Sequence, residues 1–223
     1  MTIKVLFENQ DFVVCDKPAG LSFHSEQSPG LVVQLSEQLA QDLYPVHRLD
    51  KMTSGLLVLA KKPTIAQAFQ TQFEQRQIEK YYLAISTQKP KKKQGWIKGD
   101  MLPARRGSYR LTTTMDNPAI TQFISASLAP NERAFLVKPH TGKTHQIRVA
   151  LKSLGAPIAG DSRYQSVEQA KLEDRGYLHA YALRFELNGE GYQFVCPPSE
   201  GVRFVSERFK VQCAAWNEPW NLF

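Results

Sequence analysis

An acidic residue, Asp50, stands in a polar segment that leads directly into the apolar run 55–60. A short continuous apolar run predicts a buried strand, so the carboxylate is expected at the end of a rigid element, at the mouth of a cleft. The neighbouring cations Arg48 and Lys51 favour an ionised, nucleophilic carboxylate. The alternative is an aspartate that only caps the turn and pairs with arginine, and the residues alone leave both interpretations open.

Other patterns that carry chemistry are absent from the sequence. It holds no glycine-rich phosphate loop, no GxSxG elbow and no HExxH helix. The three cysteines have neither an even count nor a CxxC spacing, which argues against a disulfide framework and a zinc ribbon. The five histidines are dispersed, so satisfied polar or core positions are favoured over metal ligands. We therefore expect no metal site.

The charge balance points to a polyanionic partner. Among 223 residues there are 28 Lys and Arg against 21 Asp and Glu, a net charge of +7. Basic surfaces bind nucleic acid through the release of counterions, although such a charge also keeps a protein soluble. The cationic runs 89–93 and 105–106 are either solvated surface or a surface that faces RNA.

Length and patterning indicate one soluble domain. With 42% apolar residues the chain can build a sizeable core, and no apolar run approaches the ~18 residues of a membrane span. The first residues do not resemble a secretory signal. We expect a cytoplasmic protein that has no contact with membranes.

Hydrophobic periodicity predicts an α+β fold with a mixed, largely antiparallel sheet flanked by helices and loops. Strands are expected at 4–7, 12–15, 55–60, 78–85, 119–128, 133–138, 178–187 and 192–196. Helices are expected at 31–43, 64–77 and 143–154. Residues 86–118 are expected to be rich in loops.

The motifs, taken together, resemble the RluA-type pseudouridine synthases over nearly the whole chain. Each matches a family motif, and they occur in the expected order. They are the KPAG segment at 17–20, HRLD with TSG at 47–55, K-x-Y-x-A at 80–84, TGKTHQIR at 141–148, the segment 156–164 and Leu178-His179-Ala180.

The resemblance implies the catalytic residues. Uracil is detached from C1′, rotated and rejoined through C5, without metal or cofactor. Asp50 is the implied essential carboxylate, acting either on the sugar or on a proton there. Arg148 is implied to pair with Asp50, and Tyr82 rather than Tyr81 to pack against the target base. A surface ion pair and a core tyrosine are the plainer alternatives for Arg148 and Tyr82.

The resemblance also implies residues that face RNA. Arg48 is expected to fill the space left when the target base flips out of its stack. His47 is expected to order the loop, and Lys17 to contact a phosphate or support that loop. The motif at 141–148 adds three further candidates: Lys143, His145 and Gln146. Because the family commonly has arginine where this chain has Lys143, a two-pronged clamp there is in doubt.

The expected organisation is one catalytic domain over 1–223, with no S4 RNA-binding domain, acting as a monomer on tRNA or ribosomal RNA. The run 72–80 favours the tRNA-modifying group of the family. One competing hypothesis is a non-catalytic RNA-binding or chaperone protein on the same fold. Another is an unrelated hydrolase with an aspartate nucleophile, for which the sequence offers no second motif.

Overall fold

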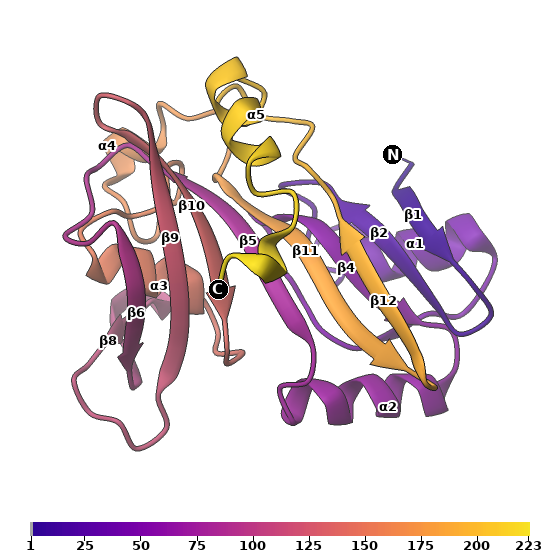
Figure 1. Ribbon diagram of the computed structural model, residues 1–223. Coiled ribbons are helices and arrows are strands. Elements are labelled where there is room, and N and C mark those ends of the chain that lie inside the picture. Colours follow the sequence, from indigo (N-terminus) through magenta and orange to yellow (C-terminus); the bar gives the residue numbers. More distant parts are fainter. Residues whose placement is uncertain (1) are drawn as a thin grey trace. The chain divides into compact units, whose positions relative to one another are not determined.

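The computed structural model describes residues 2–223 (Figure 1). The contacts within the chain divide it into two compact units. Unit 1 comprises Met1–Glu79 and His179–Cys196, and unit 2 comprises Lys80–Leu178 and Pro197–Phe223. Each unit combines helices with antiparallel strand pairs, which confirms the predicted α+β class. The expectation of a single catalytic domain stays a prediction.

Unit 1 is built on a sheet in the order β1-β2-β4-β11-β12, with β3 paired to the end of β4. The pair β4–β11 is parallel and the other pairs are antiparallel. Two helices complete the unit, α1 (Leu31–Leu39) and α2 (Pro63–Glu74). The strands are β1 (Lys4–Glu8), β2 (Phe12–Lys17), β3 (Tyr44–Pro45), β4 (Ser54–Ala60), β11 (Leu178–Leu187) and β12 (Glu190–Val195).

Two local features explain where the elements of unit 1 end. Every residue of β4 is buried, as the continuous apolar run predicted. Helix α1 ends at Leu39, four residues before the predicted end, because Ala40 adopts a left-handed conformation with φ 50°. That conformation closes the helix, since the Ala40 N–H turns back to the carbonyl of Glu37 at 3.2 Å.

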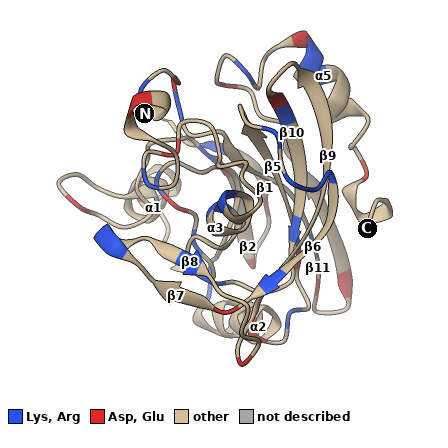
Figure 2. Cartoon of the chain, turned by 90° about the vertical axis from the view of Figure 1, so that its left-hand side faces the viewer, with Lys and Arg blue, Asp and Glu red and all other residues tan. Residues whose placement is uncertain are grey.

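Unit 2 contains an antiparallel sheet in the order β5-β10-β9-β6 and a separate hairpin, β7–β8. Figure 2 shows helix α3 on one side of this sheet and the C-terminal segment on the other. The strands are β5 (Glu79–Ser86), β6 (Gln94–Gly99), β7 (Met101–Pro103), β8 (Tyr109–Leu111), β9 (Ala119–Ala129) and β10 (Glu132–Pro139). The helices are η1 (Arg105–Gly107), α3 (Gln146–Ser153), α4 (Val167–Ala170), α5 (Glu207–Ala214) and η2 (Pro219–Asn221).

Two features of unit 2 go beyond the sequence predictions. Residues 86–118 are rich in loops, as expected, and they also hold the short strands β6, β7 and β8. Strand β6 contains two glycines, and β7 and β8 are three residues long, so none of them shows the apolar alternation of a longer strand. Helix α3 begins three residues later than predicted because His145, directly before it, is left-handed with φ 58°.

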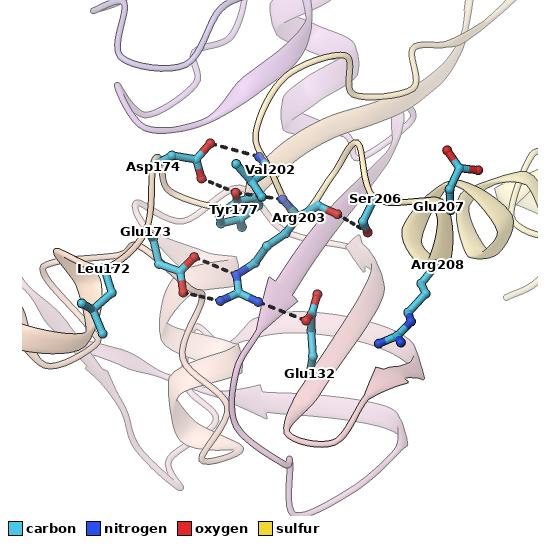
Figure 3. A pocket seen from close by; sticks show the side chains of 10 residues that line it. All are labelled: Glu132, Leu172, Glu173, Asp174, Tyr177, Val202, Arg203, Ser206, Glu207 and Arg208. Carbon is cyan, nitrogen blue, oxygen red and sulfur yellow. Dashed lines mark hydrogen bonds and ion pairs between the residues drawn. The ribbon is translucent and has the colours of Figure 1, made fainter.

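The C-terminal segment of unit 2 is anchored through Arg203 (Figure 3). Its guanidinium binds both carboxylate oxygens of Glu173, at 2.7 and 2.9 Å, and Glu132 on β10 at 3.0 Å. These groups line a cavity of about 540 Å³. Because the central charge is already paired by acidic neighbours, we interpret this network as structural.

No helix within residues 2–223 has both the length and the apolar character needed to cross a membrane.

Candidate active site

The turn that carries Asp50 rests on the ammonium group of Lys17. This lysine is fully buried, and its Nζ donates to the carbonyl oxygens of Thr53 at 2.7 Å, Pro18 at 2.9 Å and Lys51 at 3.3 Å. A fully buried side chain has no surface to offer to a phosphate. Of the two roles predicted for Lys17, the structure therefore supports loop support and corrects the RNA contact.

The imidazole of His47 ties the same segment to the sheet of unit 1. Its Nε2 accepts a hydrogen bond from the backbone N–H of Val58 in β4 at 3.0 Å, and its ring lies 5.0 Å from that of Phe73. An imidazole nitrogen that accepts this bond is held in one orientation. The geometry fits the loop-ordering role expected for His47.

Close packing below the turn depends on Gly55. Its φ is +103°, and a Cβ at this position would lie 2.2 Å from the carbonyl oxygen of Ala180 in β11. Only glycine allows this approach of the parallel strands β4 and β11. The strand that follows Asp50 is thereby held against its neighbour.

A buried chain of hydrogen bonds fixes Ser54, the first residue of β4. The Nε2 of His179 lies 2.7 Å from the carbonyl oxygen of Cys196, which can only accept, so Nε2 carries a proton. With a neutral ring, Nδ1 then accepts from the Ser54 hydroxyl at 2.7 Å. The chain orders the start of β4 without exposing any of these groups.

Asp50 and Arg48 occupy the part of the turn that remains accessible. Asp50 is half-buried and Arg48 is exposed. The turn is closed through its backbone, since the N–H of Thr53 donates to the Asp50 carbonyl at 2.9 Å. A carboxylate on a turn that is anchored by Lys17 and Gly55 is held in a defined place.

In unit 2, the two adjacent tyrosines of β5 have different surroundings. Tyr81 is fully buried, with Phe223 and the ammonium of Lys138 beside its ring. Tyr82 is half-buried and pairs with Val137 of β10. Because successive side chains of a strand point to opposite faces, Tyr82 lies on the face away from this cluster. The choice of Tyr82 over Tyr81 as the active-site tyrosine stays a prediction.

Lys80 shares the Tyr82 face of β5 and was given no role by the sequence analysis. A Cβ built on Gly142 would lie 3.9 Å from the Lys80 Nζ, so the ammonium lies next to the loop that precedes α3. Burial lowers the pKa of Lys80. The sequence feature that could have pointed to Lys80 is its position as the first residue of the K-x-Y-x-A motif at 80–84.

Arg148 makes a two-point ion pair with Asp161. The Nε–Oδ2 distance is 2.7 Å and the Nη2–Oδ1 distance is 2.8 Å, and the two residues are 7% and 1% exposed. Two parallel bonds fix the plane as well as the position of the guanidinium. The sequence analysis quoted the segment of Asp161 but gave the residue no role. The predicted pairing of Arg148 with Asp50 stays a prediction.

Tyr164 links this ion pair to the β7–β8 hairpin. The Arg148 guanidinium lies 5.1 Å from the centre of the Tyr164 ring. The phenol oxygen accepts from the Tyr109 N–H at 3.0 Å and lies 2.9 Å from Nδ1 of His145. Burial raises the pKa of Tyr164, so the hydroxyl keeps its proton and can donate it to Nδ1. A neutral His145 then carries its ring proton on Nε2.

Gln146 acts as a clamp within its own loop. Its Oε1 accepts from the Thr141 hydroxyl at 2.7 Å and from the Lys143 N–H at 3.0 Å. Its Nε2 donates to the Ile120 carbonyl and the Thr121 hydroxyl, each at 3.0 Å. Because Gln146 is buried and its amide is used in this way, the predicted RNA contact is corrected to a structural role.

Lys143 lies at the edge of the same loop. It is half-buried, and its Nζ donates to Oδ1 of Asn117 at 2.7 Å. A single ammonium cannot make the planar two-pronged contact of the family's usual arginine. Lys143 therefore offers one positive charge rather than a clamp.

The predicted site residues fall into two groups, one in each unit. Unit 1 brings Lys17, His47, Arg48 and Asp50 together around one turn. Unit 2 brings its own set together near the start of α3, namely Lys143, His145, Gln146 and Arg148, with Tyr82 on β5. Within residues 2–223, no group of three or more His, Cys, Asp or Glu side chains is arranged to hold a metal ion.

Comparison with known proteins agrees with this arrangement of motifs. Residues 11–153 match the model of a family described as RNA pseudouridylate synthase. An uncharacterised RNA pseudouridine synthase of Haemophilus influenzae is 48% identical over 207 residues, which is 92% of each chain. The tRNA pseudouridine synthase C of Pasteurella multocida is 27% identical and covers 99% of this chain and 94% of its own. The structure of human RNA pseudouridylate synthase domain containing 4 superposes with a TM-score of 0.74 at 26% identity, over 93% of each chain.

Proposed function

Because the chain belongs to the RluA-type family of RNA pseudouridylate synthases, we propose that it isomerises specific uridines of tRNA or ribosomal RNA, with Asp50 as the essential carboxylate. The observation that carries this proposal is the family match over 11–153, which includes the Asp50 turn, β5 and the loop before α3. Family members are isomerases, so no other reactant is consumed.

The reaction exchanges one bond to the sugar for another. The bond from N1 of uracil to C1′ breaks, and a bond from C5 to C1′ forms. The proton of C5 is lost to solvent and N1 gains one. A carboxylate suits the step at C1′, either as nucleophile or as the group that assists deprotonation there.

The support for Asp50 is the rigidity of its turn. Lys17 and His47 hold the loop through hydrogen bonds to the backbone of Thr53 and Val58. Gly55 allows the strand that follows to pack closely against β11. Preorganisation of a reacting group contributes to rate because the group loses little freedom during the reaction. An aspartate that only closed the turn would not need this degree of support, since the backbone bond from Thr53 already closes it.

We assign the remaining catalytic roles to Tyr82 and Arg148. Tyr82 offers a half-buried ring on the face of β5 opposite to the Tyr81 cluster, suited to packing against the target base. Arg148 supplies a guanidinium oriented by Asp161.

The target base must leave its stack before C1′ can be reached, and unstacking costs a few kcal/mol. The exposed Arg48, two residues before Asp50, is assigned to the vacated space. Lys143 and His145 are assigned to contacts with the RNA backbone.

The direct test is release of tritium from bulk RNA labelled at C5 of uridine. The wild type is expected to release tritium, and Asp50→Asn is expected to release none while still binding RNA. The matched control, Asp42→Asn, alters an exposed aspartate of the same unit and is expected to behave as wild type. RNA binding without release by the wild type would instead indicate a non-catalytic RNA-binding protein.

The RNA class is tested with separate tRNA and ribosomal RNA fractions from cells that lack the gene. Sites missing in those cells and restored by the purified protein identify the substrate. Restoration in neither fraction would overturn the proposed substrates.

A further inference from the structure

A second cavity of unit 2, of about 590 Å³, lies between the β7–β8 hairpin, the exposed side of α3 and the segment after Asp161. Helix α3 and strand β8 are in contact, and Figure 2 shows them side by side. The lining residues are Ser108, Tyr109, Arg110, Leu111, Val149, Lys152, Ser153, Arg163, Tyr164, Gln165 and Ser166.

The charged groups of this lining are all cationic. Arg110, Lys152 and Arg163 contribute to it, and none of the lining residues is Asp or Glu. All three are exposed, so their charges face solvent. The lining also holds three serine hydroxyls, of which those of Ser108 and Ser153 already donate to the backbone carbonyls of Arg105 and Ala150, each at 2.7 Å. This lining attracts an anion, because it contains cations and no carboxylate that would repel a negative charge.

The walls of the cavity are bonded to one another. The Tyr109 N–H donates to the Tyr164 hydroxyl at 3.0 Å. The Arg163 Nη1 donates to the carbonyls of Arg106 at 3.0 Å and Gly107 at 2.7 Å, at the tip of the hairpin. These bonds join the hairpin to the segment after Asp161, so the cavity exists before any ligand arrives.

The neutral part of the lining suits more than a bare phosphate ion. Leu111 is half-buried and Val149 is buried, and both add apolar surface beside the two tyrosines. Proteins hold single-stranded RNA in this way, with cations on the phosphates and aromatic or apolar groups against base or ribose.

We propose that this cavity binds a backbone phosphate of the RNA and the nucleoside attached to it, beyond the target uridine. Arg110 and Lys152 contact the phosphate. Arg163 chiefly holds the hairpin tip that forms the wall. The proposal rests on the proposed function, since it makes the cavity a second anchor for the same RNA.

The test variant is the double substitution Arg110→Gln with Lys152→Gln. Its control is Arg208→Gln with Lys210→Gln, which removes one exposed arginine and one exposed lysine from α5 of the same unit. Figures 1 and 2 both show α5 well away from β8. Neither pair includes a residue assigned to catalysis.

Binding of a fluorescein-labelled oligouridylate is measured by anisotropy over a salt series. Each lost phosphate contact lowers the slope of log affinity against log salt by about 0.7 for single strands, so the test variant is expected to lose about 1.4. The control is expected to keep the wild-type slope. Equal slopes for test variant and wild type, or an equal loss in both double variants, would overturn the proposal.

Turnover of C5-tritiated bulk RNA separates this proposal from the proposed function. The test variant is expected to keep the wild-type kcat with a KM raised about tenfold, because the anchor lies outside the reacting atoms. A wild type that releases no tritium refutes the proposed function, while the salt slopes still decide the binding site. Circular dichroism checks that all variants are folded.

Inorganic phosphate and uridine monophosphate distinguish RNA from a free small anion. Thermal stabilisation of the wild type by either compound, lost in the test variant while the RNA salt slope is unchanged, would make the cavity a small-molecule site. That outcome would contradict the proposal.

Discussion

The guanidinium of Arg148 and the carboxylate of Asp161 form a buried, two-point ion pair, with donor–acceptor distances of 2.7 and 2.8 Å. The pair joins α3 to the segment of Asp161, which lies 13 residues after Arg148 in the sequence. Together with the ring of Tyr164, 5.1 Å from the guanidinium, it fixes the orientation of a side chain to which we assign a catalytic role.

Asp161→Asn is expected to lower kcat at least tenfold and to destabilise the fold by about 3 kcal/mol, because it removes a negative charge from a buried cation. Steady-state kinetics below the melting temperature and urea unfolding measure the two effects. Asp116→Asn, at an exposed aspartate of the same unit, is the control. Wild-type kcat in Asp161→Asn would contradict the positioning role.

Lys17→Met is expected to reduce the free energy of unfolding by about 1–3 kcal/mol, because buried carbonyls lose their donor. Activity should fall as well, since the Asp50 turn loses its support. Lys51→Met is the control: its ammonium pairs with Glu26 at 3.3 Å on the surface, where such pairs contribute below about 1 kcal/mol. Equal stability of the two variants would show that the ammonium of Lys17 does not support the turn.

Gly55→Ala is expected to destabilise the protein more than Gly189→Ala. Both glycines have positive φ, +103° and +80°, so both variants carry backbone strain of about 1–3 kcal/mol. Only at Gly55 would the new methyl group meet a backbone carbonyl, at 2.2 Å, whereas Gly189 has nothing within 4 Å. Urea unfolding compares the two, and equal losses would argue against close packing as the reason for Gly55.

Arg48→Ala is expected to slow turnover more on structured RNA than on a single-stranded oligonucleotide. In a structured RNA the flipped base leaves a gap that Arg48 would fill, whereas a single strand has no such gap. Arg184→Ala, an exposed arginine on β11, serves as the control. Equal losses on both substrates would remove the gap-filling role.

The thiols of Cys15 and Cys196 are expected to resist alkylation in the folded protein. Burial raises the pKa of each from the ordinary value of 9.0 to about 12, so the reactive thiolate is scarce at pH 8. Their contribution to stability is present below pH 9.0 and is lost as the pH rises towards about 12, because the unfolded thiols release their protons first. Mass spectrometry after iodoacetamide treatment, with and without urea, measures the protection. Rapid labelling of the folded protein at pH 8 would contradict it.

The sequence by itself determined the features that depend on residues close together along the chain. The continuous apolar run before Lys61 predicted the buried strand β4. The turn residues 188–191 between two strand-like segments predicted β11 at its observed bounds, Leu178–Leu187. The ordered motifs predicted the family, which the comparisons confirm. Local patterns of this kind carry their information within a few residues.

Only the tertiary structure decided which distant groups meet. Lys17 and Thr53 are 36 residues apart, and their contact turned a predicted RNA-facing lysine into a buried support. Gln146 changed role in the same way, through the carbonyl of Ile120. The cavity beside Arg110 and Lys152 also needed the fold, since β7 and β8 are too short to be seen in the pattern. The physical reason is that a polar side chain takes its role from the partners and the solvent around it, and the folded chain supplies both from residues far away in sequence.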